Sequence, residues 1–197
     1  MLKAKDFRSR AWSKLHGNWA TAVLSQLIMV LITGALAFTY VGSLLVAGPL
    51  TVGLALVIIN IVRKNDPRIE NLFTPFKDFV RTFVLWIINT IFIALWALLF
   101  IIPGIIKALS YSMSYFILID NSSLSANEAR KASMALMDGN KWRLFCLYFS
   151  FIGWILLSML TFGIVLFWVM PYIRTAKAEF YQSLIETDGD EPLAIEG

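Results

Sequence analysis

Six apolar runs divide this chain of 197 residues, at about residues 18–38, 43–62, 80–101, 104–119, 142–160 and 164–184. Each run is close to the roughly 20 residues with which a helix crosses the hydrocarbon core of a bilayer. A helix also satisfies its backbone hydrogen bonds within its own segment, as lipid requires. The runs therefore predict an all-α fold, a multi-pass transmembrane helical bundle with six spans in three hairpins.

The composition agrees with a membrane protein and excludes other classes. Hydrophobic residues make up 58% of the chain and charged residues only 15%, whereas soluble domains are about 25% charged. A soluble fold of this length has too few charged residues to cover so much apolar surface. The single cysteine excludes a disulfide-rich secreted domain, and the high hydrophobic content excludes intrinsic disorder.

The basic residues gather on one side of the predicted bundle. Fourteen of the seventeen lie before the first hairpin (five) or in the two long connections that follow (five and four), while the short turns inside the hairpins hold no charge. By the positive-inside rule the basic side is the cytoplasm, so both termini are predicted to be cytoplasmic. Beside hydrophobic spans, this excess of positive charge indicates anionic lipid and not nucleic acid.

Residues 1–185 are predicted to form a single polytopic membrane domain, followed by an acidic flexible tail over 186–197. Five of the thirteen acidic residues lie in that tail. The sixth run is the least apolar, since it contains Arg174, Lys177 and Glu179. An alternative with five spans therefore stays open, in which one long helix covers about 142–170 and the tail lies outside the cell.

The charged connections contain further predicted helices. Two segments have an apolar helical face beside basic residues, and both are expected to be cytoplasmic amphipathic helices that lie in the membrane surface. Their apolar residues are Leu2, Phe7, Ala11 and Leu15 in the N-terminal arm, and Ile69, Leu72, Phe73, Phe76 and Val80 in the second connection.

The third connection has the signature of a capped helix. Ser125 and Glu128 have the spacing of a capping box, in which the two side chains satisfy free amides at a helix start. We expect a helix from Ala126 to about Asp138, ended by Gly139.

A weak internal repeat accompanies these segments. Gly17-Asn18 and Gly139-Asn140 each precede an apolar run, and Pro49 and Pro171 follow them at the same offset of 122 residues. Membrane folds are often built from related units of this kind. Because three matching positions also arise by chance, the pattern leaves open whether three units of surface helix, span, turn and span exist.

Several separated motifs resemble a known family. They occur in order at 95–107 (LWALLFIIPGIIK), 110–120 (SYSMSYFILID), 128–133 (EARKAS), 139–141 (GNK) and 171–172 (PY). In combination they are similar to the bacterial integral membrane family known as domain of unknown function 975, and the resemblance covers roughly residues 1–185. It implies a multi-pass protein of the bacterial cell membrane and supplies no established activity or catalytic residues.

The residues that most enzymes need are missing. The chain has one histidine, His16, and one cysteine, Cys146, too few for a metal cluster, and it lacks a Walker phosphate loop, a G-x-S-x-G motif and a dinucleotide fingerprint. General acid or base catalysis needs a positioned proton carrier, which the apolar runs do not offer. We therefore predict no enzyme activity, no metal and no cofactor.

Three basic residues lie outside the cytoplasmic connections, and they define the candidate site. Arg174, Lys177 and Tyr181 share one helical face, while Lys107, Ser110 and Tyr111 lie on a second polar stripe. If both stripes face inward, they form a cationic pocket for a phosphate or a lipid headgroup. The alternative is that the cations reach out to the membrane surfaces, with Arg174 and Lys177 paired to Glu179.

The charge distribution and the candidate site are compatible with two functions. The first is a non-enzymatic membrane protein that binds, senses or carries anionic lipid or a lipid-linked anion. The alternative is an accessory or immunity-type subunit that acts through a membrane-protein or peptide partner. Neither requires nucleic acid.

Overall fold

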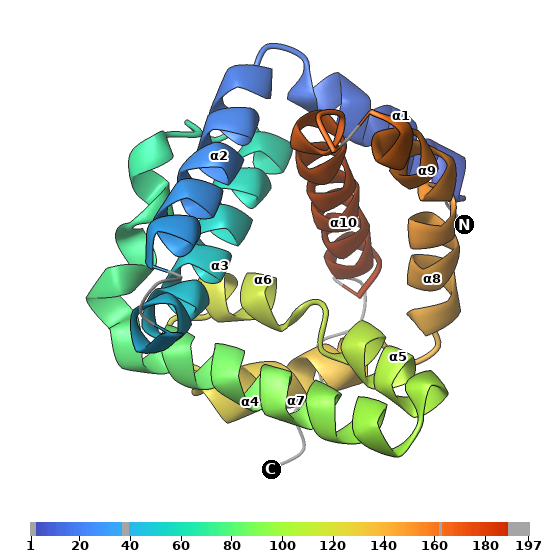
Figure 1. Ribbon diagram of the computed structural model, residues 1–197. Helices are drawn as coiled ribbons and strands as arrows, with labels where there is room; N and C mark the ends of the chain where they lie inside the picture. The colour runs from blue at the N-terminus through green and yellow to red at the C-terminus, as the bar shows by residue number, and fades with distance from the viewer. Residues whose placement is uncertain (1–2, 37–39, 162, 189–197) are drawn as a thin grey trace.

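The computed structural model describes residues 3–36, 40–161 and 163–188, and within them the regular elements are all helical (Figure 1). The elements are α1 (Ala4–Leu15), α2 (Trp19–Ala35), α3 (Tyr40–Arg63), two 3₁₀ turns η2 (Ile69–Leu72) and η3 (Thr74–Asp78), α4 (Phe79–Leu99), α5 (Ile101–Ser110), α6 (Ser114–Asp120), α7 (Ala126–Leu136), α8 (Lys141–Phe149), α9 (Ile152–Leu160) and α10 (Leu166–Asp188). The prediction of an all-α fold is confirmed for these residues.

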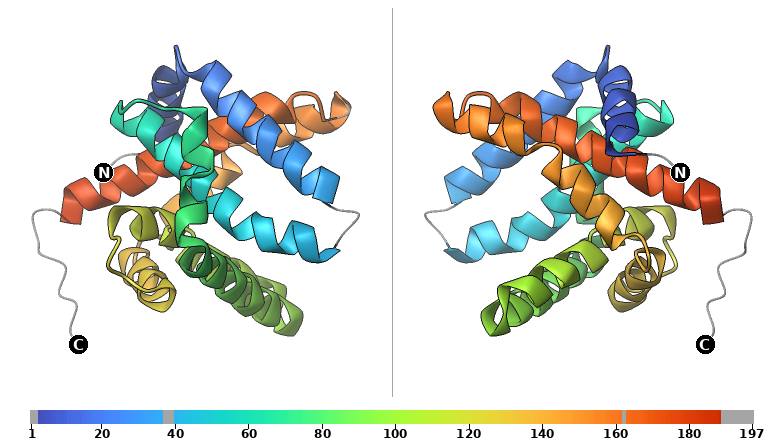
Figure 2. Two further views of the ribbon diagram at one scale, coloured as in Figure 1. Left: turned by 90° about the vertical axis from the view of Figure 1, so that its left-hand side faces the viewer. Right: turned by 90° about the vertical axis from the view of Figure 1, so that its right-hand side faces the viewer.

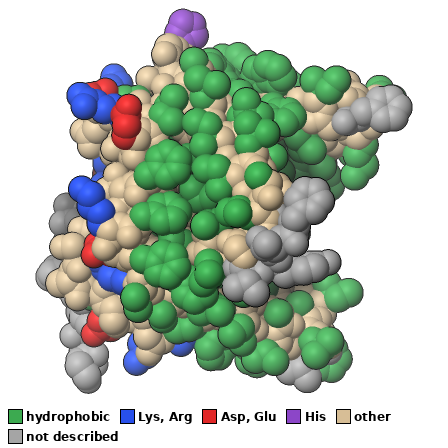
Figure 3. Space-filling model, turned by 60° about the vertical axis from the view of Figure 1, so that its left-hand side comes forward, with side chains coloured by type: hydrophobic (Ala, Val, Ile, Leu, Met, Phe, Trp, Pro, Cys, Tyr) green, Lys and Arg blue, Asp and Glu red, His purple; other side chains and the backbone are tan. Residues whose placement is uncertain are grey.

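The chain folds back on itself three times, where α2 meets α3, α4 meets α5, and α9 meets α10. In the left view of Figure 2 these three ends point away from α7 and from the end of α10. Figure 3 shows the same division on the surface, because hydrophobic side chains cover most of the face while charged side chains gather along one edge. The division agrees with a membrane protein whose charged connections share one side.

Four segments are long and apolar enough to cross a membrane, namely Gly42–Arg63, Ile69–Leu98, Ile101–Asp120 and Lys141–Leu160. A fifth qualifies if α1 and α2, which meet at 95°, count as one bent span. The last helix, α10, is not among them because it is rich in charged residues. The proposed single helix over 142–170 is wrong, since α9 ends at Leu160 and α10 begins at Leu166.

Two of the apolar runs contain a helix break, which periodicity did not predict. Between α5 and α6, the hydroxyls of Ser112 and Ser114 donate to backbone carbonyl oxygens three residues earlier, both at 2.7 Å. Between α8 and α9, the Ser150 hydroxyl does the same to Leu147 at 2.7 Å. Serine side chains that bond their own backbone compete with the helical hydrogen bonds. α5 ends at Ser110 and α8 at Phe149, next to these serines.

The N-terminal arm does not lie on the membrane surface with its apolar face toward lipid. Phe7, Ala11 and Leu15 are at most 2% exposed, and the Phe7 ring meets the edge of Phe180 on α10 with 5.1 Å between centroids. The prediction was wrong about the partner because a periodic apolar face packs equally well on protein and on lipid.

The predicted amphipathic helix over 69–80 does not form as a single α-helix. Its place is taken by η2 and η3, with Pro75 near the start of η3, and α4 begins only at Phe79. Leu72 is fully buried, and a Cβ atom at Gly53 of α3 would lie 2.0 Å from the Leu72 carbonyl oxygen. The backbone of η2 thus approaches α3 at a distance that only glycine permits.

The capped helix is confirmed. The Ser125 hydroxyl accepts a hydrogen bond from the Glu128 amide at 3.3 Å, and a Glu128 carboxylate oxygen accepts one from the Ser125 amide at 2.6 Å. Bonds from the Ser125 hydroxyl and backbone hold the pKa of Glu128 below its usual range. The cap is therefore complete at neutral pH and weakens as the pH falls through that lowered pKa. Gly139 follows α7 with a φ of 71°.

The element order repeats at the offset of 122 residues. α1 and α7 begin at Ala4 and Ala126, and Gly17 and Gly139 both have a positive φ. The segment before each hairpin packs on another hairpin: η2 and η3 on α3, α7 on α4 and α6, and α1 on α10 and α8. The three units therefore close into a ring.

The predicted tail is partly helical. Residues 186–188 belong to α10, and 189–197 lie outside the described residues.

Within the described part, the buried core gathers on α3 and α10, with Leu54, Val57 and Ile58 on the first and Ala176 and Phe180 on the second.

Candidate functional site

Arg174 and Lys177 lie on one face of α10, three residues apart, and both are half-buried. The Arg174 Nη1 atom is 4.0 Å from the Met29 sulfur on α2. Tyr148 on α8 is close enough to interact electrostatically with the guanidinium of Arg174. The Lys177 Nζ atom lies 5.6 Å from the ring centroid of Phe116 on α6. The neighbours of the two cations therefore come from all three hairpins.

No carboxylate neutralises these two cations in the part of the chain that the structure describes. Its four ion pairs join Lys14 to Glu179, Arg63 to Asp120, Arg68 to Asp66 and Lys141 to Asp138. Glu179, the partner that the alternative interpretation expected, lies 3.9 Å from Lys14 of α1 instead. Two neighbouring cations repel one another and lose hydration when half-buried, so an anion between them is favoured.

Tyr181, one turn further along α10, belongs to a different group. Its hydroxyl donates to Asp120 at 2.8 Å, and its ring stacks on Phe116 with 5.1 Å between centroids. Phe116 therefore contacts both Lys177 and Tyr181.

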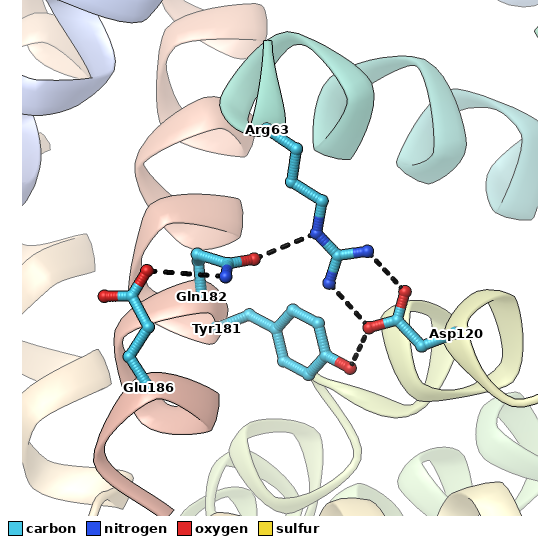
Figure 4. A network of polar contacts seen from close by, with 5 residues as sticks. All are labelled: Arg63, Asp120, Tyr181, Gln182 and Glu186. Carbon is cyan, nitrogen blue, oxygen red and sulfur yellow. Dashed lines mark hydrogen bonds and ion pairs between the residues drawn. The ribbon is translucent and has the colours of Figure 1, made fainter. Parts of the chain in front are cut away.

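A polar network joins the ends of α3 and α6 to α10 (Figure 4). Arg63 at the end of α3 donates to both carboxylate oxygens of Asp120 at the end of α6, at 2.6 and 2.7 Å. Its Nε donates to Gln182 of α10 at 2.9 Å. We call Arg63, Asp120, Tyr181 and Gln182 the latch, since bidentate arginine–carboxylate pairs fix geometry as well as adding energy.

The latch was not predicted from the sequence. Arg63 and Asp120 are 57 residues apart, and Tyr181 is 61 residues beyond Asp120. One signal was available, because an arginine and an aspartate end two apolar runs that the charge distribution assigns to the same side.

The second predicted stripe has other contacts. The Lys107 Nζ atom lies 5.2 Å from the ring centroid of Trp96 on α4. The Ser110 carbonyl accepts from Ser133 at 2.7 Å, and the Tyr111 hydroxyl accepts from Arg130 at 3.4 Å. Among the described residues, no hydrogen bond, ion pair or ring contact joins this stripe to Arg174 or Lys177. The structure thus brings together two of the six predicted site residues.

The comparisons with known proteins identify a family. A family model described as "Protein of unknown function (DUF975)" matches residues 1–110 and 98–188. No curated protein and no solved structure matches the chain. Since the two matches cover nearly the whole sequence, the chain belongs to this family.

Within the described residues, no group of three or more His, Cys, Asp or Glu side chains is placed to hold a metal ion.

Proposed function

We propose that this member of the family is a non-enzymatic protein of the bacterial cell membrane that binds an anionic lipid headgroup through Arg174 and Lys177. The observation that carries the proposal is the pair of half-buried cations on α10 without a carboxylate partner among the described residues. A guanidinium offers a planar fork of donors to a phosphate, and an ammonium adds a compact positive charge.

The proposal includes six spans with both termini in the cytoplasm. α10 has 23 residues, or about 35 Å of helix, and runs from the end where α9 meets α10 to the charged end that holds Gln182 and Glu186. A cation at mid-bilayer costs about 2.5–3.5 kcal/mol on insertion scales unless it faces a polar interior or a partner. The neighbours of Arg174 and Lys177 on α2, α6 and α8 support such an inward orientation.

Arg174→Gln and Lys177→Gln test this function. We expect each substitution to weaken retention of phosphatidylglycerol about tenfold, because each removes a charge-assisted contact with the phosphate. The measurement is native mass spectrometry of purified protein, counting bound phosphatidylglycerol against phosphatidylcholine. Lys131→Gln on the exposed face of α7 is the matched control, and it should leave lipid retention unchanged.

Equal retention of phosphatidylglycerol by the wild type, both variants and the control would remove the lipid function. A protein or peptide partner that co-purifies with all of them would then favour the accessory role. Lys107→Gln adds a further distinction: lost retention in this variant would mean that the second stripe also reaches the headgroup.

A further inference from the structure

A cavity of about 600 Å³ opens at the charged end of the molecule, between α1, α3 and α10. Its charged lining residues are Arg10, Lys14, Arg63, Lys64, Glu179 and Glu186. A neighbouring cavity of about 700 Å³ shares Lys14 and Lys64. Although Glu179 is only two residues from Lys177, it lies on a different face of α10, toward α1. The cavity is therefore distinct from the cations proposed to hold lipid.

The four basic residues of this cavity are not equally available. Arg63 is held by the latch, and Lys14 donates to the Val62 carbonyl at 2.5 Å. Arg10 and Lys64 are exposed, and among the described residues neither forms a hydrogen bond or ion pair through its side chain. Lys64 has a φ of 56°, unusual for a residue other than glycine, at the turn after α3. These two side chains have no bonded partner there, although the charge of Arg10 also acts on Glu179.

Glu179 lines the same cavity and lacks a hydrogen-bond donor. The residue is only 6% exposed, and its Oε1 atom has no hydrogen-bond donor. The nearest cation, the Lys14 Nζ, is 3.9 Å away, beyond hydrogen-bond distance. A buried carboxylate oxygen without a donor is unfavourable, so a ligand that brings an N–H group to this point is stabilised.

We propose that this cavity binds a small ligand that carries both a protonated primary amine and an anionic group. The amine pairs with the carboxylate of Glu179, which lines the cavity, and the anionic group meets Arg10 and Lys64. The chemistry fits phosphoethanolamine, either as a free solute or as the headgroup of a phospholipid. This site goes beyond the proposed function, because it uses other residues and requires an amine.

The test compares phosphoethanolamine with phosphocholine, whose quaternary ammonium has the same charge but no N–H group. Both are titrated by calorimetry into the full-length protein in phosphatidylcholine nanodiscs. We expect phosphoethanolamine to bind about tenfold more tightly, the value of one charge-assisted hydrogen bond. Glu179→Gln should abolish this preference. Arg10→Gln with Lys64→Gln should weaken both ligands alike, and Lys5→Gln on exposed α1 should change neither.

Equal affinity of the wild type for the two ligands, or no binding of phosphoethanolamine, would overturn the proposal. If Glu179→Gln does not fold, two measurements still test the proposal. They are the preference of the wild type for phosphoethanolamine and the loss of affinity in the double variant at Arg10 and Lys64, which are exposed. Nanodiscs of phosphatidylethanolamine distinguish the source of the ligand, because a bound headgroup lowers the apparent affinity for free phosphoethanolamine and a purely soluble ligand leaves it unchanged. Lipid retention at Arg174 and Lys177 is measured separately, so each proposal fails on its own result.

Discussion

Gly53→Ala is expected to destabilise the protein more than any other single methyl addition on α3. The added Cβ would lie 2.0 Å from the Leu72 carbonyl oxygen and 2.7 Å from its carbonyl carbon. Because both are backbone atoms, no side-chain rotation relieves the overlap, and η2 must move away from α3. We expect a loss of at least about 3 kcal/mol, the upper part of the range for overpacked cores. Thermal unfolding in detergent measures it.

Gly153→Ala is the matched control for this prediction. Gly153 also lies in a helix, α9, but an added Cβ there meets nothing within 4 Å. Since alanine is the better helix former by roughly 0.5–1 kcal/mol, this variant should be as stable as the wild type or more so. Equal thermal midpoints for Gly53→Ala and Gly153→Ala would show that η2 does not pack on α3 as described.

Asp120→Asn is the second substitution with a large expected effect. It removes the charge that receives two bonds from Arg63 and one from Tyr181. The pair is only partly buried, with side chains 29% and 19% exposed, so solvent screens part of its energy. We expect a loss of about 2 kcal/mol, within the range for hydrogen bonds to charged groups, measured by thermal unfolding.

The control is Asp138→Asn, which breaks an ion pair of 3.4 Å with Lys141 whose aspartate is 84% exposed. Its expected effect is close to zero, as for most surface pairs. A double-mutant cycle of Asp120→Asn with Tyr181→Phe should show coupling, because both side chains belong to one network. Additive effects of these two substitutions would contradict the latch.

Much of the fold was predictable because lipid limits a chain to a few solutions. Runs of about 20 apolar residues predict helices, and all six runs are largely helical in the structure. The Ser125–Glu128 cap and the positive φ of Gly139 were predictable as well. Each depends on residues only three or four positions apart, or on the backbone freedom of one glycine.

Partners were not predictable, because a periodic pattern defines a face and not what covers it. The apolar face of α1 packs on α10, about 170 residues away in the chain. The segment 69–80 has a helical pattern, yet Pro75 and the approach to Gly53 favour 3₁₀ turns. The latch joins residues from three distant segments, and no local signal pairs them.

Only part of the candidate site was predictable, because a pattern along one helix does not define the neighbours of that helix. The spacing of Arg174 and Lys177 places them together on α10, whatever surrounds the helix. Their meeting with Lys107 depended on how α5 and α10 are arranged. Lys107 instead lies over Trp96 of the adjacent α4.

The lipid function depends on one property of α10, namely that it crosses the membrane with its cations facing inward. If α10 lay on the cytoplasmic surface, Arg174 and Lys177 would be ordinary surface cations. The sidedness of the two ends of α10 therefore tests the proposed function most directly.

The measurement labels single cysteines with an impermeant thiol reagent, in intact cells and after lysis. In a Cys146→Ser background, Ile164→Cys lies just before α10 at a position that is 64% exposed, and Gly189→Cys follows its end. Six spans predict that Ile164→Cys is labelled in intact cells and Gly189→Cys only after lysis. Labelling of both from the same side would contradict the proposed topology, because α10 would not cross the membrane.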